Sequence, residues 1–311
     1  MKLNHKVLNI VVPLITLTVL VFFLPPFLIY KFLRFIYRLK TIENVAGKVI
    51  LITGASSGIG EHLAYEYGKR GARLALAARR EDRLRGVADK ARRLGSPDAI
   101  VILADVSKAE DCNRLVNDTV NHFGQLDHLV NNAGVTKIGL FEDCNEFSHL
   151  KSIMDTNFWG SVYCTKFAVP YLRKSKGKIV VMSSSATWFS IPRLSFYNAS
   201  KAAQTCFFET LRAELGSDLG ITIVSPGVVR SEMTETPEFQ SQVCSEMIPS
   251  QSTQVCATAI VDSACRGDMN LTDPPWIRVA FWLRVFCPQL LESITHSNSI
   301  KRPRTTSNKE N

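Results

Sequence analysis

The chain has 311 residues and a formal net charge of +9 at pH 7; apart from a terminal segment, this length suits one large α/β domain, because folds of this class commonly remain single at this size. The positive charge gathers near both ends, and no nucleic-acid recognition module accompanies it, so the composition does not indicate a nucleic-acid partner. The eight cysteines are scattered without a Cys-x-x-Cys pair, which argues against a zinc ribbon, a redox dithiol or a disulfide framework, and no metal site is predicted.

The first predicted element is an apolar segment over residues 7–30 that contains no charged side chain. It exceeds the roughly 20 residues that cross the hydrocarbon core of a bilayer. A cleaved signal peptide is the weaker interpretation, because the apolar stretch is long and no small-residue cleavage site precedes Lys31. Three prolines, Pro13, Pro25 and Pro26, interrupt helical hydrogen bonding, so a kinked single span and an apolar hairpin both remain open. We therefore predict a hydrophobic membrane anchor with a basic flank over residues 1–46.

A glycine-rich turn follows the first predicted strand, residues 48–53, and leads into a helix-like segment. Strand, glycine-rich turn and helix in this order are the context of a dinucleotide-binding fingerprint. The spacing is Gly-x-x-x-Gly-x-Gly. We expect Gly54 to permit the tight turn, Gly58 to let the backbone approach a pyrophosphate, and Gly60 to allow close packing of the helix on the strand. The helix N-terminus then favours the anion.

Strands and helices continue to alternate along the chain. Further strands are predicted over residues 73–78, 100–103, 126–130, 178–182 and 221–224, with helices over 81–94, 109–123, 147–174 and 196–219. This alternation predicts an α/β fold with a Rossmann-type doubly wound parallel sheet, in which ligands bind beyond the carboxyl ends of the strands. The residues expected at those ends are Thr53, Gly54, Arg79, Asp105, Asn131, Asn132, Ser184, Pro226 and Gly227.

Tyr197 and Lys201 lie four residues apart, so on a helix both side chains project from one face. Such a pair alone is common on solvated helix surfaces. Ser184, at the end of a predicted strand, adds a hydroxyl group to it. Because a phenol beside a fixed ammonium has a stabilised anion, these three groups together are able to move a proton to or from an alcohol.

These motifs jointly resemble those of the short-chain dehydrogenase/reductase family over residues 47–227. The resemblance rests on Thr53 to Gly60, Asn131 to Gly134, Asn157, Ser184, the Tyr197-x-x-x-Lys201 pair, and Pro226 with Gly227. Within the family, the sequence is most similar to the 11β-hydroxysteroid dehydrogenases, and its proline-bearing anchor is typical of the steroleosins of plant oil bodies. The catalytic domain is accordingly expected over residues 47–291.

The resemblance implies a role for each catalytic residue. Tyr197 is expected to be the general acid/base, with its pKa lowered from about 10 by Lys201 and by the positive charge of the oxidised cofactor. Lys201 also holds the ribose hydroxyls. Ser184 and Tyr197 contact the substrate oxygen, and Asn157 holds a water that links Lys201 to solvent. Asn131 is expected to brace the sheet.

The end of the second predicted strand indicates which dinucleotide binds. NAD enzymes place a carboxylate there, whereas an arginine suits a 2′-phosphate. No acidic residue follows Ala78 directly, Arg79 is in the phosphate-binding position, and Glu81 and Asp82 open the next helix. We therefore predict NADP rather than NAD. The resemblance assigns its binding to Gly54, Ser56, Ser57, Gly58, Ile59, Gly60, Arg79, Asp105, Val106, Asn132, Ala133, Gly134, Tyr197, Lys201, Pro226 and Gly227.

The last third of the chain is less regular. Residues 269–272 are predicted as a final edge strand, and residues 292–311 as a polar, disordered tail. The apolar run over residues 274–290, with Trp276 and Trp282, suits a helix packed on the core, a dimer contact or a second membrane-touching surface. Residues near Tyr197 either line an apolar cleft or pack in the core: Ala186, Trp188, Phe189, Ile191, Leu194 and Phe196.

The predicted function is that of an NADP-dependent oxidoreductase that interconverts a secondary alcohol and a ketone on a lipophilic, sterol-like substrate. The alternatives are the same chemistry on a fatty-acyl or retinoid-like substrate, and a lipid-droplet coat protein that keeps the fold without turnover. The complete set of Asn157, Ser184, Tyr197 and Lys201 argues against the coat protein. The resemblance also implies a homodimer formed through the helices over 147–174 and 196–219, and a location at the surface of a lipid droplet or the endoplasmic reticulum membrane.

Overall fold

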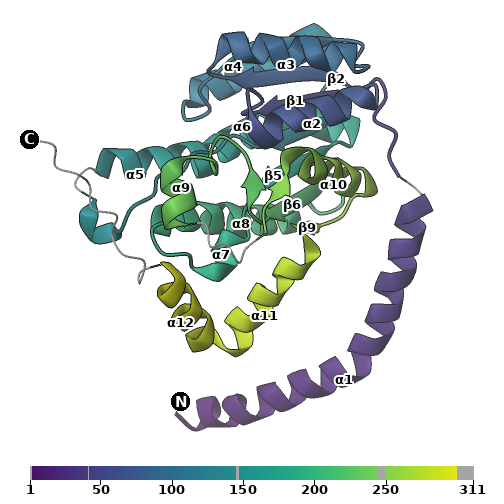
Figure 1. Cartoon of the computed structure of the whole chain (residues 1–311). Coiled ribbons are helices and arrows are strands. Elements are labelled where there is room, and N and C mark those ends of the chain that lie inside the picture. Colours follow the sequence, from purple (N-terminus) through teal and green to yellow (C-terminus); the bar gives the residue numbers. More distant parts are fainter. Residues whose placement is uncertain (1, 41, 145–146, 244–248, 300–311) are drawn as a thin grey trace, which may run out of the picture. The chain divides into compact units, whose positions relative to one another are not determined.

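The computed structural model describes residues 2–40, 42–144, 147–243 and 249–299. It divides into two compact units, residues 1–43 and residues 44–311, and each unit is treated by itself. The first unit is the single helix α1 (Lys2–Lys40), which curves along its length in Figure 1. Of the two shapes left open for the anchor, the structure therefore describes a continuous helix and not a hairpin.

The second unit is built on a seven-stranded parallel sheet, which confirms the predicted fold class (Figure 1). The strand order is β3-β2-β1-β4-β5-β6-β9. Its members are β1 (Val49–Thr53), β2 (Arg73–Ala78), β3 (Ala99–Leu103), β4 (His128–Asn131), β5 (Lys178–Met182), β6 (Gly220–Pro226) and β9 (Asn270–Asp273). The order reverses direction between β1 and β4, so the topological switch point lies beside the glycine-rich turn that follows β1.

Alternate side chains of each strand enter two separate cores, because successive residues of a strand point to opposite faces. In β1, Ile50 and Ile52 pack on one face and Val49 and Leu51 on the other. The first face is covered by α2 (Gly58–Lys69), α3 (Glu81–Arg93) and α10 (Thr253–Arg266). The second face is covered by α4 (Ala109–Phe123), α6 (Gly160–Ser175) and α8 (Ser195–Leu215). Both faces of the sheet are thus covered by helices, which leaves the ends of the strands as the place where a ligand can reach the sheet.

Two predicted helices differ from the structure in a way that matters for the site. The segment predicted as one helix over 147–174 consists of α5 (Phe147–Met154), the π-helical turn η2 (Asp155–Trp159) and α6. Asn157 lies in this π-helical turn, a feature that is frequent at functional sites. The helix predicted over 196–219 ends at Leu215, because Gly216 has a φ of +58° and stops it.

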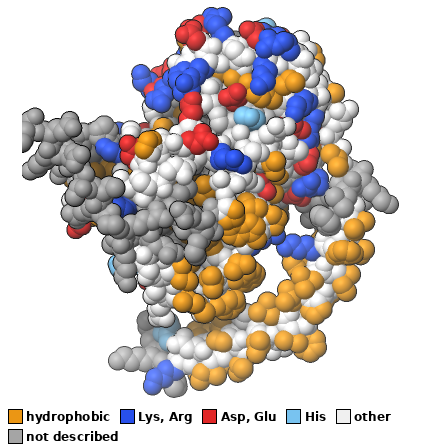
Figure 2. Space-filling model, viewed as in Figure 1, with side chains coloured by type: hydrophobic (Ala, Val, Ile, Leu, Met, Phe, Trp, Pro, Cys, Tyr) orange, Lys and Arg blue, Asp and Glu red, His pale blue; other side chains and the backbone are white. Residues whose placement is uncertain are grey.

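The C-terminal part contributes β9 and then η3 (Pro275–Ile277), α11 (Arg278–Phe286) and α12 (Pro288–Ser299). The expected disorder from residue 292 is wrong for residues 292–299, which are helical, and residues 300–311 lie outside the described residues. Hydrophobic side chains gather on the surface over α11 (Figure 2), where Trp282 is 55% and Phe286 73% exposed. These side chains do not pack into the core.

The remaining elements are short. They are η1 (Phe141–Asp143), α7 (Ala186–Phe189), β7 (Val229–Arg230), α9 (Pro237–Gln242) and β8 (Gln251–Ser252). The strands β7 and β8 pair with each other in a separate small sheet. The seven cysteines in the described part of the chain are not joined by disulfides, and Cys244 lies outside it.

Candidate active site

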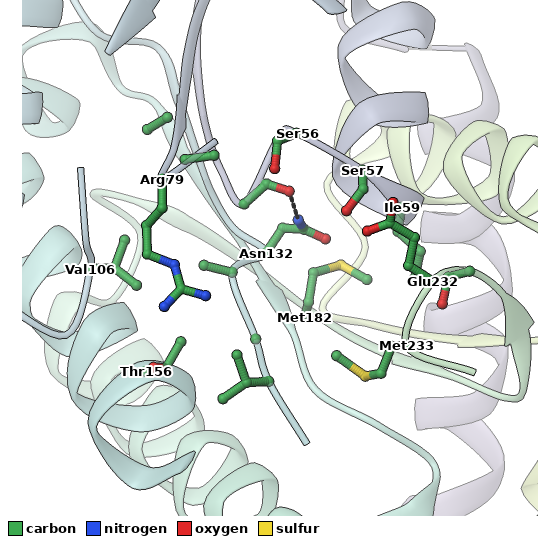
Figure 3. A pocket seen from close by; sticks show the side chains of 18 of the residues that line it. Ser56, Ser57, Ile59, Arg79, Val106, Asn132, Thr156, Met182, Glu232 and Met233 are labelled. Atoms are coloured by element: carbon green, nitrogen blue, oxygen red, sulfur yellow. Dashed lines mark hydrogen bonds between the residues drawn. The ribbon is translucent and has the colours of Figure 1, made fainter. Parts of the chain in front are cut away.

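A pocket opens at the carboxyl ends of the sheet strands, and most residues predicted to bind a dinucleotide line it (Figure 3). We call it the cofactor pocket. Of the sixteen predicted residues, the lining includes all except Gly60 and Gly227. Gly60 lies in the first turn of α2, packed against Gly54 and Asn132, and Gly227 lines a second pocket.

The glycine turn has no space for a Cβ at Gly54 or Gly60. Gly54 has a φ of +66°, and a Cβ there would lie 2.7 Å from the Ala133 Cα. A Cβ on Gly60 would lie 2.3 Å from the Gly54 oxygen and 2.4 Å from the Asn132 Nδ2. Asn132 itself donates to the carbonyl oxygens of Thr53 (2.9 Å) and Gly54 (3.2 Å). The turn and the end of β4 therefore form one tightly packed cradle.

The N-terminus of α2 faces this cradle and carries unsatisfied backbone donors. Ser57, the residue before the helix, has no side-chain capping bond. The first N–H groups of a helix have no partner within it, and together with the helix dipole they favour an anion. The residues present thus fit the diphosphate of a dinucleotide.

Two arginines at the end of β2 differ in their contacts. Arg79 is exposed, lines the cofactor pocket and extends into it on the side of Val106 (Figure 3). Arg80 donates to the hydroxyls of Ser57 (2.6 Å) and Ser56 (3.3 Å) and to the Glu232 carboxylate (2.9 Å). Arg80 therefore ties the glycine turn to the segment after β7, while Arg79 is the arginine directed into the pocket.

The end of β3 is held in shape by its own hydrogen bonds. The Asp105 carboxylate accepts from the Ser107 backbone N–H (3.1 Å) and hydroxyl (2.8 Å). The Val106 carbonyl accepts from the Cys112 thiol (3.3 Å), and a Cβ on Gly160 would lie 2.8 Å from a Val106 methyl group. This wall of the pocket is fixed before any ligand binds.

The four predicted catalytic residues come from three elements. Tyr197 and Lys201 lie on α8, one turn apart, and the Lys201 Nζ is 5.9 Å from the centroid of the Tyr197 ring. Ser184 follows β5 and is hydrogen-bonded to Tyr197. Asn157 lies on η2, where its side chain accepts from the Val135 N–H (2.8 Å) and donates to the Val135 carbonyl (3.0 Å). Asn157 thereby anchors the loop that follows β4.

Burial dominates the acid–base properties of the pair on α8. It raises the pKa of Tyr197, and the hydrogen bond with Ser184 lowers that pKa only in part. Lys201 was expected to lower the pKa of Tyr197, but in the protein without cofactor it does not contribute to the shift of that pKa. Burial also lowers the pKa of Lys201 to about 7, because the ammonium has little water around it. The chain by itself therefore holds a neutral phenol beside a lysine that titrates near neutrality.

A second, largely apolar pocket meets the first at Tyr197. We call it the substrate pocket. Its apolar wall consists of Ala186, Phe189, Ile191, Leu194, Val228, Phe239, Val243, Trp276 and Ile277. Its polar groups include Ser184 and Thr136. The Thr136 hydroxyl has no hydrogen-bond partner in the described structure. Tyr197 and Met233 line both pockets.

Of the six residues proposed for an apolar cleft, four line the substrate pocket and two pack elsewhere. Trp188 makes an edge contact with Phe281, and Phe196 stacks on Phe141. Four residues of the two pockets were not predicted from the sequence: Arg80, Glu232, Met233 and Thr136. The double arginine was a visible signal, whereas the other three come from irregular segments without a motif. Asn131 donates to the Thr165 hydroxyl (2.9 Å) and so joins β4 to α6.

Comparisons with known proteins agree with this geometry. Residues 48–241 match the sequence model of the short chain dehydrogenase family. The chain is 53% identical to 11-beta-hydroxysteroid dehydrogenase 1A of Arabidopsis thaliana, with 94% of this chain and 87% of that protein covered. It is 52% identical to 11-beta-hydroxysteroid dehydrogenase A of Sesamum indicum, with the same coverage. A crystal structure of a short-chain type dehydrogenase/reductase from Mycobacterium marinum superposes with a TM-score of 0.68 at 26% identity, covering 76% of this chain and 96% of that one.

Proposed function

The chain belongs to the short-chain dehydrogenase family, and from this premise we propose that it is an NADP-dependent oxidoreductase that interconverts a secondary alcohol and a ketone on a lipophilic, sterol-like substrate. Its oxidoreductase class and its similarity to hydroxysteroid dehydrogenases follow from the family. The cofactor's phosphate, the catalytic roles and the substrate class are the proposal.

The observation that carries the proposal is the position of Tyr197 in the wall between the two pockets. An acid/base for alcohol oxidation has to reach the carbinol and lie beside the ring that exchanges the hydride. A residue that lined only one pocket would not meet both requirements. Tyr197 lines both pockets, which supports this role for it.

The side chains of this protein transfer the proton. In oxidation, the Tyr197 phenolate accepts the hydroxyl proton of the alcohol; in reduction, the Tyr197 phenol donates its proton to the carbonyl oxygen. The Ser184 hydroxyl donates to the same substrate oxygen as charge develops on it. Lys201, charged, favours the phenolate over the phenol and so offsets the effect of burial on Tyr197. A nicotinamide dinucleotide, when bound, supplies or accepts the hydride.

Arg79 supports NADP over NAD. Its guanidinium extends into the cofactor pocket, and no acidic side chain replaces it at the end of β2. A guanidinium binds a phosphate dianion through charge-assisted hydrogen bonds. The Glu232 carboxylate, which lines the same pocket, is bonded to Arg80 and Arg83. The positive charge of Arg79 is therefore available to a 2′-phosphate.

The substrate pocket supports a lipophilic alcohol. Branched aliphatic and aromatic side chains make most of its wall, and its polar groups include Ser184 and Tyr197 at the junction with the cofactor pocket. Such a wall favours apolar ligands, and a few placed polar groups orient them. Sterol-like, fatty-acyl and retinoid-like alcohols share this chemistry.

A panel experiment tests the proposal. Full-length protein, extracted with detergent, is incubated with NADP+ and sterol, fatty and retinoid alcohols, and NADPH fluorescence is followed. We expect turnover of a sterol-like alcohol, and a loss of about 10²–10⁴-fold in kcat for Tyr197→Phe, since the variant keeps the ring but has no proton to exchange. Unchanged turnover in Tyr197→Phe would refute the acid/base assignment. Absence of turnover across the whole panel would instead favour the coat protein.

We further propose that the protein is membrane-anchored, at a lipid droplet or the endoplasmic reticulum. Residues Asn4–Leu33 of α1 are long and apolar enough to cross a bilayer, with a mean hydropathy of 2.7. The hydroxyls of Thr16 and Thr18 donate to carbonyls one turn earlier (2.8 Å each), which satisfies them in the absence of water. The exposed aromatic surface over α11 supports a second contact with lipid. A homodimer through α5, α6 and α8 remains part of the proposal.

A further inference from the structure

Gln204 is a fully buried amide on α8 that connects three parts of the site. Its Oε1 accepts from the Lys201 Nζ (3.3 Å). Its Nε2 donates to the Asn157 backbone oxygen (2.9 Å) and to the Ser161 hydroxyl (2.6 Å). It lines neither the cofactor pocket nor the substrate pocket, so any effect on the reaction passes through its neighbours.

The partners of Gln204 permit only one orientation of its amide. A backbone carbonyl only accepts hydrogen bonds, and an ammonium only donates them. The opposite orientation would place the amide oxygen against the Asn157 carbonyl and the amide NH₂ against the Lys201 ammonium. Gln204 is therefore fixed as an acceptor for the charged form of Lys201.

The same bonds occupy the carbonyl of Asn157. This oxygen accepts from the Gln204 Nε2 and from the Ser161 hydroxyl (3.1 Å), which uses both of its lone pairs. That Asn157 holds a water linking Lys201 to solvent stays a prediction, but its backbone carbonyl is already occupied. The amide of Gln204 stands between Lys201 and this carbonyl.

Lys201 depends on the few acceptors around it. It is only 3% exposed, and besides Gln204 its Nζ donates to the Met182 carbonyl (2.7 Å). An ammonium removed from water is unfavourable unless hydrogen bonds replace the lost hydration. A fixed acceptor favours the charged form of such a group over the neutral form.

Building on the proposed function, we propose that Gln204 is a positioning residue that holds Lys201 in its charged form. The third N–H of the Lys201 ammonium is then directed to the cofactor pocket beside Tyr197. Gln204 acts through Lys201 and touches neither substrate nor cofactor. Its amide joins Lys201 to the Asn157 carbonyl inside the protein, and it leaves proton exchange to the pocket side.

Titration of Lys201 in the cofactor-free, full-length protein tests this role. Lysine is labelled with ¹³C at Cε, the signals are followed by NMR from pH 5 to 10, and the Lys201 signal is assigned by its loss in Lys201→Arg. The wild-type midpoint is expected at about 7. Gln204→Met keeps the side-chain length and removes the acceptor, so the midpoint should fall by about one pH unit. Gln204→Glu places a carboxylate at the ammonium, so the midpoint should rise by about one unit or more.

Opposite shifts of the Lys201 midpoint in the two variants distinguish a positioning role from a packing role. If Gln204 were needed only for packing, the midpoint would shift in the same direction in both variants or would not shift at all. Ser161→Ala is the matched control: it removes a partner of the Gln204 amide and leaves both acceptors of Lys201, so the midpoint should stay in place. If Gln204→Met does not fold, the rise in Gln204→Glu alone carries the test. A midpoint that does not rise in Gln204→Glu overturns the proposal.

Activity provides a separate readout. The basic limb of the pH profile for alcohol oxidation should move in the same direction as the Lys201 midpoint in each variant, with about a tenfold change in rate per pH unit on that limb. Opposite NMR shifts without turnover of any alcohol would leave the role of Gln204 standing and refute the proposed function. If an alcohol is turned over but neither the basic limb nor the Lys201 midpoint shifts in the variants, the proposed function stands and the role of Gln204 is refuted.

Discussion

The cofactor pocket and the substrate pocket share Tyr197, yet they are built from different materials. The cofactor pocket is made of strand ends, a glycine turn and a helix N-terminus, and backbone groups form much of its wall. The substrate pocket is made of apolar side chains from α7, α9, η3 and the irregular segments between them. Backbone geometry has to be correct to within a fraction of an ångström, whereas an apolar wall changes shape with each side chain.

This difference separates the two functions of the site. In the proposed function, the cofactor pocket binds a constant part, the dinucleotide, and its turn has no space for a Cβ at Gly54 or Gly60. The substrate pocket, in the same proposal, binds the variable part, and its shape is set by side chains that can be exchanged. Four experiments test whether the two pockets differ in this way.

The largest effect is expected from one methyl group in the glycine turn. Gly60→Ala places a Cβ 2.3 Å from the Gly54 oxygen, so the turn has to move. We expect loss of dinucleotide binding and a decrease of about 1–3 kcal/mol in the free energy of unfolding, as for other overpacked sites. Isothermal calorimetry with NADPH and urea unfolding measure the two effects.

The matched control is Gly86→Ala on α3, where an added Cβ meets nothing within 4 Å. Alanine there should stabilise the protein by about 0.5–1 kcal/mol, because glycine is unfavourable in a helix interior. Equal behaviour of the two variants would show that the turn is not the constrained part of the molecule.

The second effect comes from the buried cation at the junction of the pockets. Lysine titrates at about 10.4 in an unfolded chain, and the pKa of Lys201 in the folded, cofactor-free chain is about 7. Between these values the unfolded state binds more protons, so the contribution of Lys201 to the free energy of unfolding increases as the pH rises from 7 to 10. Lys201→Met should remove this increase, which amounts to a few kcal/mol.

Urea unfolding of both proteins at several pH values gives the measurement. The variant should be the more stable protein at pH 7 in the absence of cofactor, and the difference should disappear toward pH 10. Curves that stay parallel across this window would show that Lys201 is not a buried titrating group.

The third effect concerns the choice between dinucleotides. Arg79→Ala should weaken NADPH binding about ten- to hundredfold, the range for a lost hydrogen bond to a charged group, and should leave NADH binding nearly unchanged. Arg85→Ala on α3 changes the net charge equally, but its guanidinium is bonded to Glu81, so it serves as the control. Equal losses for NADPH and NADH would refute the NADP assignment.

The smallest effect is expected in the apolar wall. Ile277→Ala enlarges the substrate pocket, since Ile277 is 2% exposed and lines it. The ratio of kcat/KM between a bulky and a slender alcohol should change about tenfold, while the Kd of NADPH stays the same. Val279→Ala, at a 59% exposed position, is the control. A changed Kd for NADPH would contradict the separation of the two pockets.

Predictability from sequence followed the same division. The strands of the large sheet were predicted to within two residues at their ends, because most of them are short apolar runs covered on both faces. The residues of the cofactor pocket followed from the family resemblance, which rests on glycine spacing and strand ends that are visible in the sequence. The substrate pocket was only partly anticipated. Met233 and Thr136 come from segments without periodicity, and no sequence pattern placed them beside Tyr197.

The sequence by itself determined the sheet, its glycine turn and the pairing of Tyr197 with Lys201, because these depend on local periodicity and on spacing along one helix. Only the tertiary structure showed that Tyr197 stands between two pockets, that Arg80 reaches Glu232, and that Gln204 takes the position between Lys201 and Asn157. Each of these features depends on residues from different elements. Packing brings their side chains together, and a pattern along the sequence does not specify the distances between them.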